Sequence, residues 1–231
     1  GVTSVVVSTQ HKDGVSLDHE SESSVAVEVT TTDASGATYS ETFTIAVGDV
    51  NEGPSDIALS NSSVDENAAG AVVGSLSTTD VDAGDSHSYA VDDARFVIEN
   101  GALSLKSGVA LDHEAGDIVN VTVTAQDGGN PALSASQQYS VLVLDVNEAP
   151  TDITLSASTI DEGVATNTTV GGLTTTDQDS ADTHAYTLVA GAGDSDNASF
   201  KISGANIVND AVFDFETKSA YSVNVRTTDN G

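Results

Sequence analysis

The sequence contains no cysteine, methionine or tryptophan, and aromatic residues make up only 4% of its 231 positions. Without cysteine the chain can form neither a disulfide nor a thiolate metal site. With so few large side chains a domain buries little area per residue, so bound ions could supply part of the missing stability. No apolar run approaches the ~18 residues that a membrane-spanning helix needs. We therefore expect no direct membrane insertion.

Basic residues are also scarce, with 6 Lys and Arg against 36 Asp and Glu and a formal net charge of −30. Nucleic acids and anionic membranes are bound through clusters of Lys and Arg, so we expect no nucleic-acid partner. Hydrophobic residues make up 38% of the chain, and many alternate with polar ones, which argues against disorder. The surplus of carboxylates suits a chain that collects cations.

The same motifs return in the same order along the chain, which indicates an internal repeat. The string DVNEGPSDIALS at 49–60 returns as DVNEAPTDITLS at 145–156. Other recurring motifs are LDHE at 17–20 and 111–114, with FDFE at 213–216, and the D-x-D pairs at 80–82 and 177–179. We predict the C-terminal half of a repeat at 1–52, a complete repeat at 53–148, and a repeat lacking its last strand at 149–231. The chain opens with neither an initiator Met nor a signal peptide, and we interpret it as part of a larger secreted protein.

Within the complete repeat, apolar residues alternate with polar ones at a period of two. Val119, Val121 and Val123 are separated by single polar residues, a pattern typical of a half-buried strand. Asn100-Gly101 between two apolar runs predicts a two-residue hairpin turn, in which both positions take positive φ. About seven short strands in one repeat predict two packed sheets. The predicted fold class is all-β, with tandem Greek-key, immunoglobulin-like β-sandwiches arranged end to end.

The acidic residues recur at fixed positions of the repeat, and almost all fall in connections rather than strands. A calcium ion needs about 6–8 oxygen ligands, mostly carboxylates and carbonyls. No single segment supplies that many, and the D-x-D pairs lack the spacing of an EF-hand loop. The ligands must therefore converge from several loops. In a chain of sandwiches these loops meet at the linker between neighbours, where we predict the calcium sites.

These motifs, in this order, resemble the calcium motifs of the cadherin family, in particular of its bacterial cadherin-like and adhesin members. They are DEN at 65–67 and DEG at 161–163, then LDHE, DVNE-x-P, D-x-D, and AQDGG at 125–129. His19 and His113 depart from the family pattern by replacing an arginine that is not itself a ligand. Glu52 and Glu148 replace an aspartate of the linker. The resemblance implies tandem cadherin-like repeats that bind Ca²⁺ where one repeat meets the next.

The resemblance also assigns ligands to the two junctions, position by position. The first carboxylate set, between the first and second repeats, is Asp18, Glu20, Asp49, Asn51, Glu52, Asp80, Asp82 and Asp127. The second carboxylate set, between the second and third repeats, is Glu66, Asp112, Glu114, Asp145, Asn147, Glu148, Asp177, Asp179 and Asp229. Glu162, Asp214 and Glu216 look like half of a further site, and Asp33 is expected to belong to an earlier junction.

The resemblance implies a calcium-binding adhesion or extension segment at the cell surface, within a larger secreted bacterial protein. Calcium at the junctions would make the tandem array rigid, because opposed carboxylates repel without it. The expected partners are calcium, other cadherin-like repeats and surface glycans.

Two other functions compete with this interpretation. The alternative is a calcium-dependent carbohydrate-binding module of a secreted or cell-surface bacterial protein. Sugar rings usually stack on exposed aromatic side chains, and a chain without Trp and with five Tyr offers few such platforms. A glycosidase would need a pair of carboxylates, but every strong pair here belongs to a linker motif. Neither G-x-S-x-G nor H-E-x-x-H is present, so we predict that the chain is not an enzyme.

Overall fold

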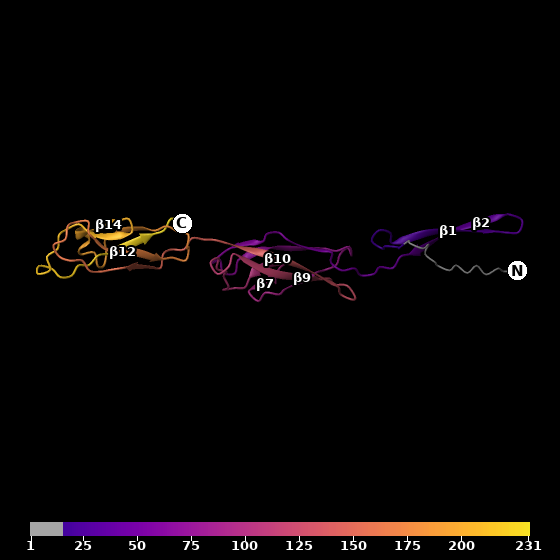
Figure 1. Ribbon diagram of the computed structural model, residues 1–231. Helices are drawn as coiled ribbons and strands as arrows, with labels where there is room; N and C mark the ends of the chain where they lie inside the picture. The colour runs from indigo at the N-terminus through magenta and orange to yellow at the C-terminus, as the bar shows by residue number, and fades with distance from the viewer. Residues whose placement is uncertain (1–15) are drawn as a thin grey trace. The chain divides into compact units, whose positions relative to one another are not determined.

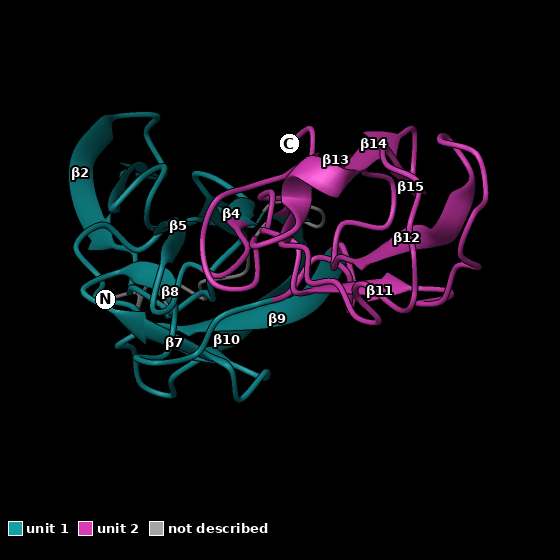
Figure 2. Cartoon of the chain, turned by 90° about the vertical axis from the view of Figure 1, so that its left-hand side faces the viewer, with its two compact units in different colours: residues 1–64, 68–111, 118–143 teal, residues 65–67, 112–117, 144–231 magenta. Residues whose placement is uncertain are grey.

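The computed structural model describes residues 16–231, which fall into two compact units (Figure 1; Figure 2). Of the described residues, unit 1 comprises 16–64, 68–111 and 118–143, and unit 2 comprises 65–67, 112–117 and 144–231. Besides strands, the described residues contain one short 3-10 helix, η1 (Asn197–Ser199), and no helix of a length and apolarity that could cross a bilayer. The predicted all-β fold class is confirmed. The first 15 residues of the predicted first repeat lie outside the described residues.

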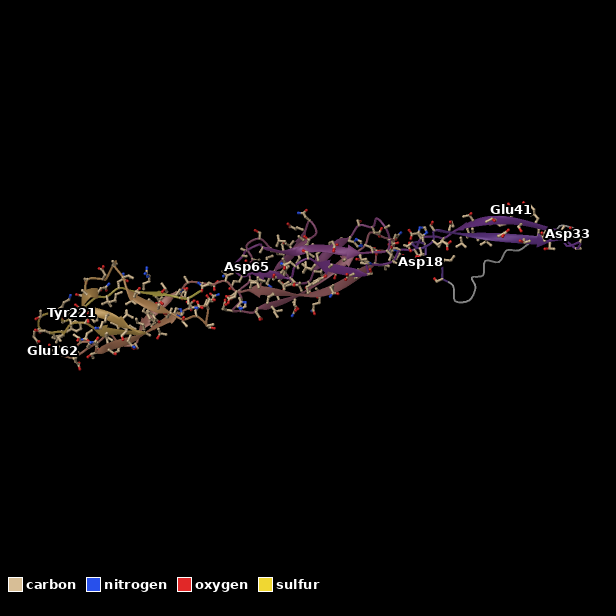
Figure 3. The ribbon with its side chains drawn as sticks, turned by 90° about the horizontal axis from the view of Figure 1, so that it is seen from above. Asp18, Asp33, Glu41, Asp65, Glu162 and Tyr221 are labelled. Atoms are coloured by element: carbon tan, nitrogen blue, oxygen red, sulfur yellow. The ribbon has the colours of Figure 1, made fainter. Side chains whose placement is uncertain are left out.

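A long hairpin of β1 (Ser24–Thr32) and β2 (Thr38–Ala46) begins the described part of unit 1. Its two strands pair antiparallel along their whole length. Asp33 closes the turn, because its Oδ1 accepts hydrogen bonds from two backbone N–H groups within the turn. Asp18 lies at the opposite end of the hairpin (Figure 3).

Two four-stranded sheets form the sandwich of the middle repeat, in the orders β3-β5-β8-β7 and β4-β10-β9-β6. The first sheet contains β3 (Asp56–Leu59), β5 (Val72–Thr79), β7 (Phe96–Glu99) and β8 (Ala102–Leu105). The second contains β4 (Ser63–Asp65), β6 (Ser88–Val91), β9 (Ile118–Gln126) and β10 (Ser134–Leu144). Several neighbours in each sheet are distant in sequence, so the chain crosses repeatedly between the sheets, as in Greek-key sandwiches.

The core of the middle repeat lies between these two sheets. Val121, Val123 and Val141 are fully buried, which confirms the predicted alternation in β9 and extends it to β10. The facing sheet contributes Val73, Phe96, Leu103 and Leu105. Because successive side chains of a strand point to opposite faces, the polar residues between the valines face solvent. The packed core therefore fixes the strands, and with them the loops at the ends of the sandwich.

In unit 2 the third repeat forms a four-stranded sheet, β11-β12-β15-β14, and a two-stranded sheet, β13-β16. The larger sheet contains β11 (Asp152–Leu155), β12 (Thr169–Thr176), β14 (Phe200–Ser203) and β15 (Asn206–Asn209). The smaller sheet contains β13 (Ala185–Leu188) and β16 (Val225–Thr228). The order of the larger sheet repeats that of β3-β5-β8-β7, so the two repeats share this half of the fold.

Glycine and asparagine shape the backbone at two repeated features. Asn100 and Gly101 have φ angles of 51° and 74°, which confirms the two-residue turn predicted between β7 and β8. In β5 the register against β8 shifts between Val72 and Gly74, forming a β-bulge. A Cβ on Gly74 would lie 2.6 Å from the backbone oxygen of Asn61. Only glycine therefore allows the strand to approach the chain this closely.

Candidate metal centres

Glu66 lies at the centre of the second carboxylate set, all of which belongs to unit 2. Its side chain is only 2% exposed. Its Oε2 accepts a hydrogen bond from the N–H of His113 at 2.9 Å, and its Oε1 accepts one from the N–H of Val146 at 2.9 Å. One carboxylate thus ties together the DEN triplet, the LDHE motif and the linker.

Glu148 of the linker contacts the D-x-D loop of the third repeat. Its N–H donates to Asp179 Oδ2 at 2.7 Å, and its Oε1 accepts a hydrogen bond from the Asn67 side chain. One oxygen each of Glu114, Glu148 and Asp179 lie within 4.8 Å of one another. Three carboxylates this close repel one another unless a cation lies among them.

Glu114 also lies close to further members of the second set. Gln178 lies within the D-x-D pair and donates its Nε2–H to Glu114 Oε2 at 3.2 Å. Ligand atoms also lie within 4.8 Å of one another in Glu66 with Asp112 and Glu114, and in His113 with Glu114 and Asp145. Segments around residues 66, 114, 145 and 179 therefore meet at one place in unit 2.

The first carboxylate set lies entirely in unit 1 and reproduces this geometry. The N–H of Glu52 donates to Asp82 Oδ2 at 2.8 Å, which is the contact that Glu148 makes with Asp179. Ligand atoms lie within 4.8 Å of one another in Glu20 with Glu52 and Asp82, and in His19 with Glu20 and Asp49. Two copies of one geometry in one chain indicate that the arrangement follows from the repeat itself.

In both sets a linker asparagine reaches the aspartate that ends a valine-containing run. Asn51 Nδ2 donates to Asp127 Oδ2 at 3.1 Å, and Asn147 Nδ2 lies 3.5 Å from Asp229 Oδ1. A Cβ on Gly129 would fall 1.6 Å from Asn51 Oδ1, so this position must be glycine for the asparagine to fit. The sequence signal is a glycine two residues after the aspartate, in AQDGG and again in TDNG.

The first aspartate of each D-x-D pair bonds within its own loop, to a histidine that motif reasoning missed. His87 Nε2 lies 2.9 Å from Asp80 Oδ2, and His184 Nε2 lies 2.7 Å from Asp177 Oδ2. The hydrogen bond from His184 lowers the pKa of Asp177 below its ordinary value. The spacing of seven residues from aspartate to histidine, identical in both repeats, is the sequence signal for this pair.

The first aspartate of each LDHE motif closes a short turn. Asp18 Oδ1 accepts hydrogen bonds from the N–H groups of Glu20 and Ser21, at 3.1 and 3.2 Å. Asp112 Oδ1 accepts one from the N–H of Ala115 at 3.1 Å. These bonds hold each aspartate beside the glutamate of its motif. Both carboxylates of LDHE are thereby directed to the same region.

Each linker glutamate carries a raised pKa. Burial raises the pKa of Glu148, and the negative charges of Glu66, Asp179 and Glu114 raise it further. Burial likewise raises the pKa of Glu52, followed by the charge of Asp82. A carboxylate in such a position is poorly stabilised as an anion by the protein alone. A bound cation would reverse this effect.

Unsatisfied oxygens test whether these residues fit a calcium ion. Among residues 16–231, the buried side-chain polar atoms without a hydrogen-bond partner are Asp85 Oδ2, Glu148 Oε2 and Asp182 Oδ2. All three are carboxylate oxygens, and all three belong to the linker or to the loop after a D-x-D pair. A buried oxygen without a donor is costly unless a cation satisfies it. The side-chain atoms around them that could bind a metal ion are overwhelmingly oxygens, which suits calcium rather than zinc.

The calcium-free protein is expected to gain stability as the pH falls from 7 towards 4.5. Glu52 and Glu148 have folded-state pKa values raised above 4.5, so the stability that their protonation provides is lost as the pH rises through those values. Asp127 and Asp177 have pKa values lowered below 3.8, so their contribution is lost only at more acidic pH. Plotted against pH, the unfolding temperature of the metal-free protein should show a maximum. This maximum should lie between the pH range in which Glu52 and Glu148 titrate and the more acidic range in which Asp127 and Asp177 titrate.

Saturating calcium provides the control for this pH dependence. With calcium bound, the rise in unfolding temperature between pH 7 and about 4.5 should disappear, because the same carboxylates are neutralised throughout. If the unfolding temperature of the metal-free protein fell steadily as the pH was lowered from 7, this would contradict the repulsion inferred for Glu52 and Glu148.

Comparison with known proteins identifies the fold. The extracellular cadherin domains 1–5 of protocadherin gamma B2 superpose with a TM-score of 0.70 at 20% identity, over 93% of this chain and 44% of that chain. Extracellular repeats 22–24 of mouse cadherin-23 superpose with a TM-score of 0.64 at 20% identity, over 87% of this chain and 68% of that chain. The fold is that of tandem cadherin repeats. No family model matches the chain.

Sequence comparison agrees with the cadherin fold. Human protocadherin-20 is 38% identical over 82 residues, which cover 34% of this chain and 9% of protocadherin-20, and the mouse protein gives the same values. The motif resemblance to cadherin repeats is thus confirmed. The chain spans only a small part of these relatives. The ligand assignments, the repeat boundaries and the bacterial origin stay predictions.

Proposed function

We propose that this chain is an extracellular adhesion or extension segment in which calcium, bound by the two carboxylate sets, fixes each cadherin-like repeat to the next. The convergence of Glu66, Glu114, Glu148 and Asp179 around a buried, unsatisfied carboxylate oxygen carries this proposal. The chemistry is binding rather than catalysis, because the grouped carboxylates accept hydrogen bonds from backbone N–H groups and otherwise face one another as like charges that a cation would neutralise. The parent protein is a larger secreted or surface protein of a bacterium.

The residues of each set act in two ways in this proposal. Glu66 and Asp127 already accept backbone hydrogen bonds and position the loops, whereas Glu114, Glu148 and Asp179 supply negative charge in close proximity. Calcium would supply the positive charge that balances them. Because the ion binds the folded loops and not the unfolded chain, it stabilises the folded state by mass action.

The proposed repeats are 1–52, 53–148 and 149–231, with the middle one complete. The recurrence of the sheet order β3-β5-β8-β7 as β11-β12-β15-β14 supports a boundary near residue 149. The extracellular location rests on the similar solved chains, which are extracellular cadherin domains. Other cadherin-like repeats are the partners that this fold favours.

Calcium titration is the direct test of the proposed function. We expect calorimetry to detect binding with dissociation constants of about 10⁻⁴–10⁻³ M or tighter, the range of extracellular modules. Asp145→Ala should remove binding at the second set and leave the first set intact, because Asp145 groups with Glu114 in that set. Small-angle scattering should show a calcium-dependent increase in maximum dimension that this variant reduces.

Asp152→Ala is the matched control for Asp145→Ala. Asp152 is an exposed residue of β11 whose described bond is to the N–H of its own neighbour, Ile153. The substitution removes one negative charge from unit 2, as Asp145→Ala does, but changes no member of either carboxylate set. A wild-type chain that gives no calcium heat at millimolar concentration would end the proposal.

A further inference from the structure

A third aspartate follows each D-x-D pair at the same spacing. Asp85 follows Asp80 and Asp82, and Asp182 follows Asp177 and Asp179, so the full pattern is D-x-D-x-x-D in both repeats. The N–H of Asp85 donates to the backbone oxygen of Asp82 at 3.2 Å. The N–H of Asp182 donates to that of Asp179 at 3.0 Å. This turn places the third aspartate directly beside the second one.

In both repeats the carboxylate of this third aspartate has one oxygen that is buried without a hydrogen-bond partner. Asp85 Oδ2 and Asp182 Oδ2 are each buried and have no hydrogen-bond partner. An unsatisfied carboxylate oxygen costs more than a neutral polar group, because it carries charge. The same atom is left without a partner in two separate repeats, so a chance local arrangement of one loop is a poor explanation.

The surroundings of Asp182 are negative rather than positive. The charges of Asp179, Asp229 and Asp177 act on its carboxylate, and all three belong to the second carboxylate set. The nearby His184 is hydrogen-bonded to Asp177. No Lys or Arg lies within the loop 177–184. The Asp182 carboxylate is therefore surrounded mainly by negative charges. An aspartate with a purely structural role would instead lie beside a basic side chain or a hydrogen-bond donor.

Asp182 also opens onto the space that the second set surrounds. A cleft in unit 2 is lined by Asp182 together with Glu114, Asp145, Asn147 and Asp179. Its other lining residues come from residues 113–117, from the D-x-D loop, and from Gly231. The third aspartate thus shares one solvent-accessible space with ligands contributed by three separate segments.

We infer that Asp85 and Asp182 are additional calcium ligands, the third carboxylate that each D-x-D loop contributes to its set. This inference rests on the proposed function. Calcium would satisfy the Oδ2 atom that the protein leaves without a partner, and the added negative charge would strengthen binding, because the number of charged ligands sets calcium affinity. Each set would then receive three carboxylates from one loop.

Asp182→Asn and Asp85→Asn test this inference, since asparagine keeps the size and removes the charge. Calorimetry with calcium chloride should show affinity reduced about tenfold at the second set in Asp182→Asn, and at the first set in Asp85→Asn. The matched controls are Asp152→Asn and Asp56→Asn, a pair of exposed aspartates in β11 and β3 at equivalent repeat positions. These controls should change affinity less than twofold.

A second measurement separates ligand loss from damage to the fold. Thermal unfolding without calcium should show Asp182→Asn at least as stable as wild type, because repulsion is relieved, while its stabilisation by calcium shrinks. If Asp182→Asn does not fold, Asp85→Asn decides by the same readouts. Wild-type affinity in both variants would overturn the inference while leaving the proposed function standing. Absence of calcium binding to the wild-type chain would instead overturn the proposed function.

Discussion

Glu66→Ala is expected to abolish calcium binding at the second carboxylate set and to lower the free energy of unfolding by about 2–4 kcal/mol. The buried carboxylate of Glu66 accepts hydrogen bonds from the N–H groups of His113 and Val146, both at 2.9 Å. Hydrogen bonds to a charged group each contribute about 1.5–3 kcal/mol. Their loss also frees the LDHE segment and the linker, so Glu114 and Asp145 no longer face Asp179 in a fixed geometry.

Calcium calorimetry and denaturant unfolding together measure the effect of Glu66→Ala. The first set should still bind calcium, because all of its members belong to unit 1, whereas Glu66 belongs to unit 2. Glu99→Ala serves as the control, since Glu99 is an exposed glutamate at the end of β7. A Glu66→Ala chain that bound calcium at the second set as wild type does would show that the carboxylate does not organise this site.

Gly74→Ala is expected to lower the free energy of unfolding by about 3 kcal/mol, at the upper end of overpacking costs. The added Cβ would lie 2.6 Å from the backbone oxygen of Asn61 and 2.8 Å from its nitrogen. These are backbone atoms, and the Asn61 side chain fixes them by donating to the backbone oxygens of Ser63 and Val73. The strand must therefore move away from the bulge or lose it.

Gly171→Ala repeats this experiment in the third repeat. There the Cβ would fall 2.4 Å from the backbone oxygen of Ala157, at an equivalent bulge in β12. Gly48→Ala is the control, because its Cβ would meet nothing within 4 Å and its φ lies outside the left-handed region. Tyrosine fluorescence during urea unfolding reports the stability, since the chain has five Tyr and no Trp. Equal stability of Gly74→Ala and Gly48→Ala would contradict the close approach.

Regular features of the fold could be predicted because the sequence itself carries the period. The alternation around Val121 in β9 requires a strand with one buried face, and Asn100-Gly101 specifies a tight turn by its φ preference. The carboxylate sets could be predicted for a related reason. Their members recur within the same motifs and in the same order, and a residue that recurs in this way occupies the same place in each repeat.

Other features depend on contacts that no local pattern encodes. Asp85 and Asp182 recur in register as clearly as the D-x-D pairs, but their importance lies in an oxygen that has no hydrogen-bond donor, which only the folded structure shows. Gly74 reads as an ordinary strand glycine until the proximity of Asn61 is known. The hydrogen bonds from His87 to Asp80 and from His184 to Asp177 could not be predicted from composition either, although the seven-residue spacing of each pair repeats.

The bond pattern of Glu66 has a consequence for chain entropy and redox behaviour. Its carboxylate joins positions 47 and 80 residues away, and Asn51 joins Asp127 across 76 residues. Ties of this span close long loops in the folded state only, whereas a disulfide keeps its loop closed in the unfolded chain as well. Here the cross-links are non-covalent. They form without an oxidant and re-form after rupture, so the fold is indifferent to the thiol–disulfide balance of the medium around it.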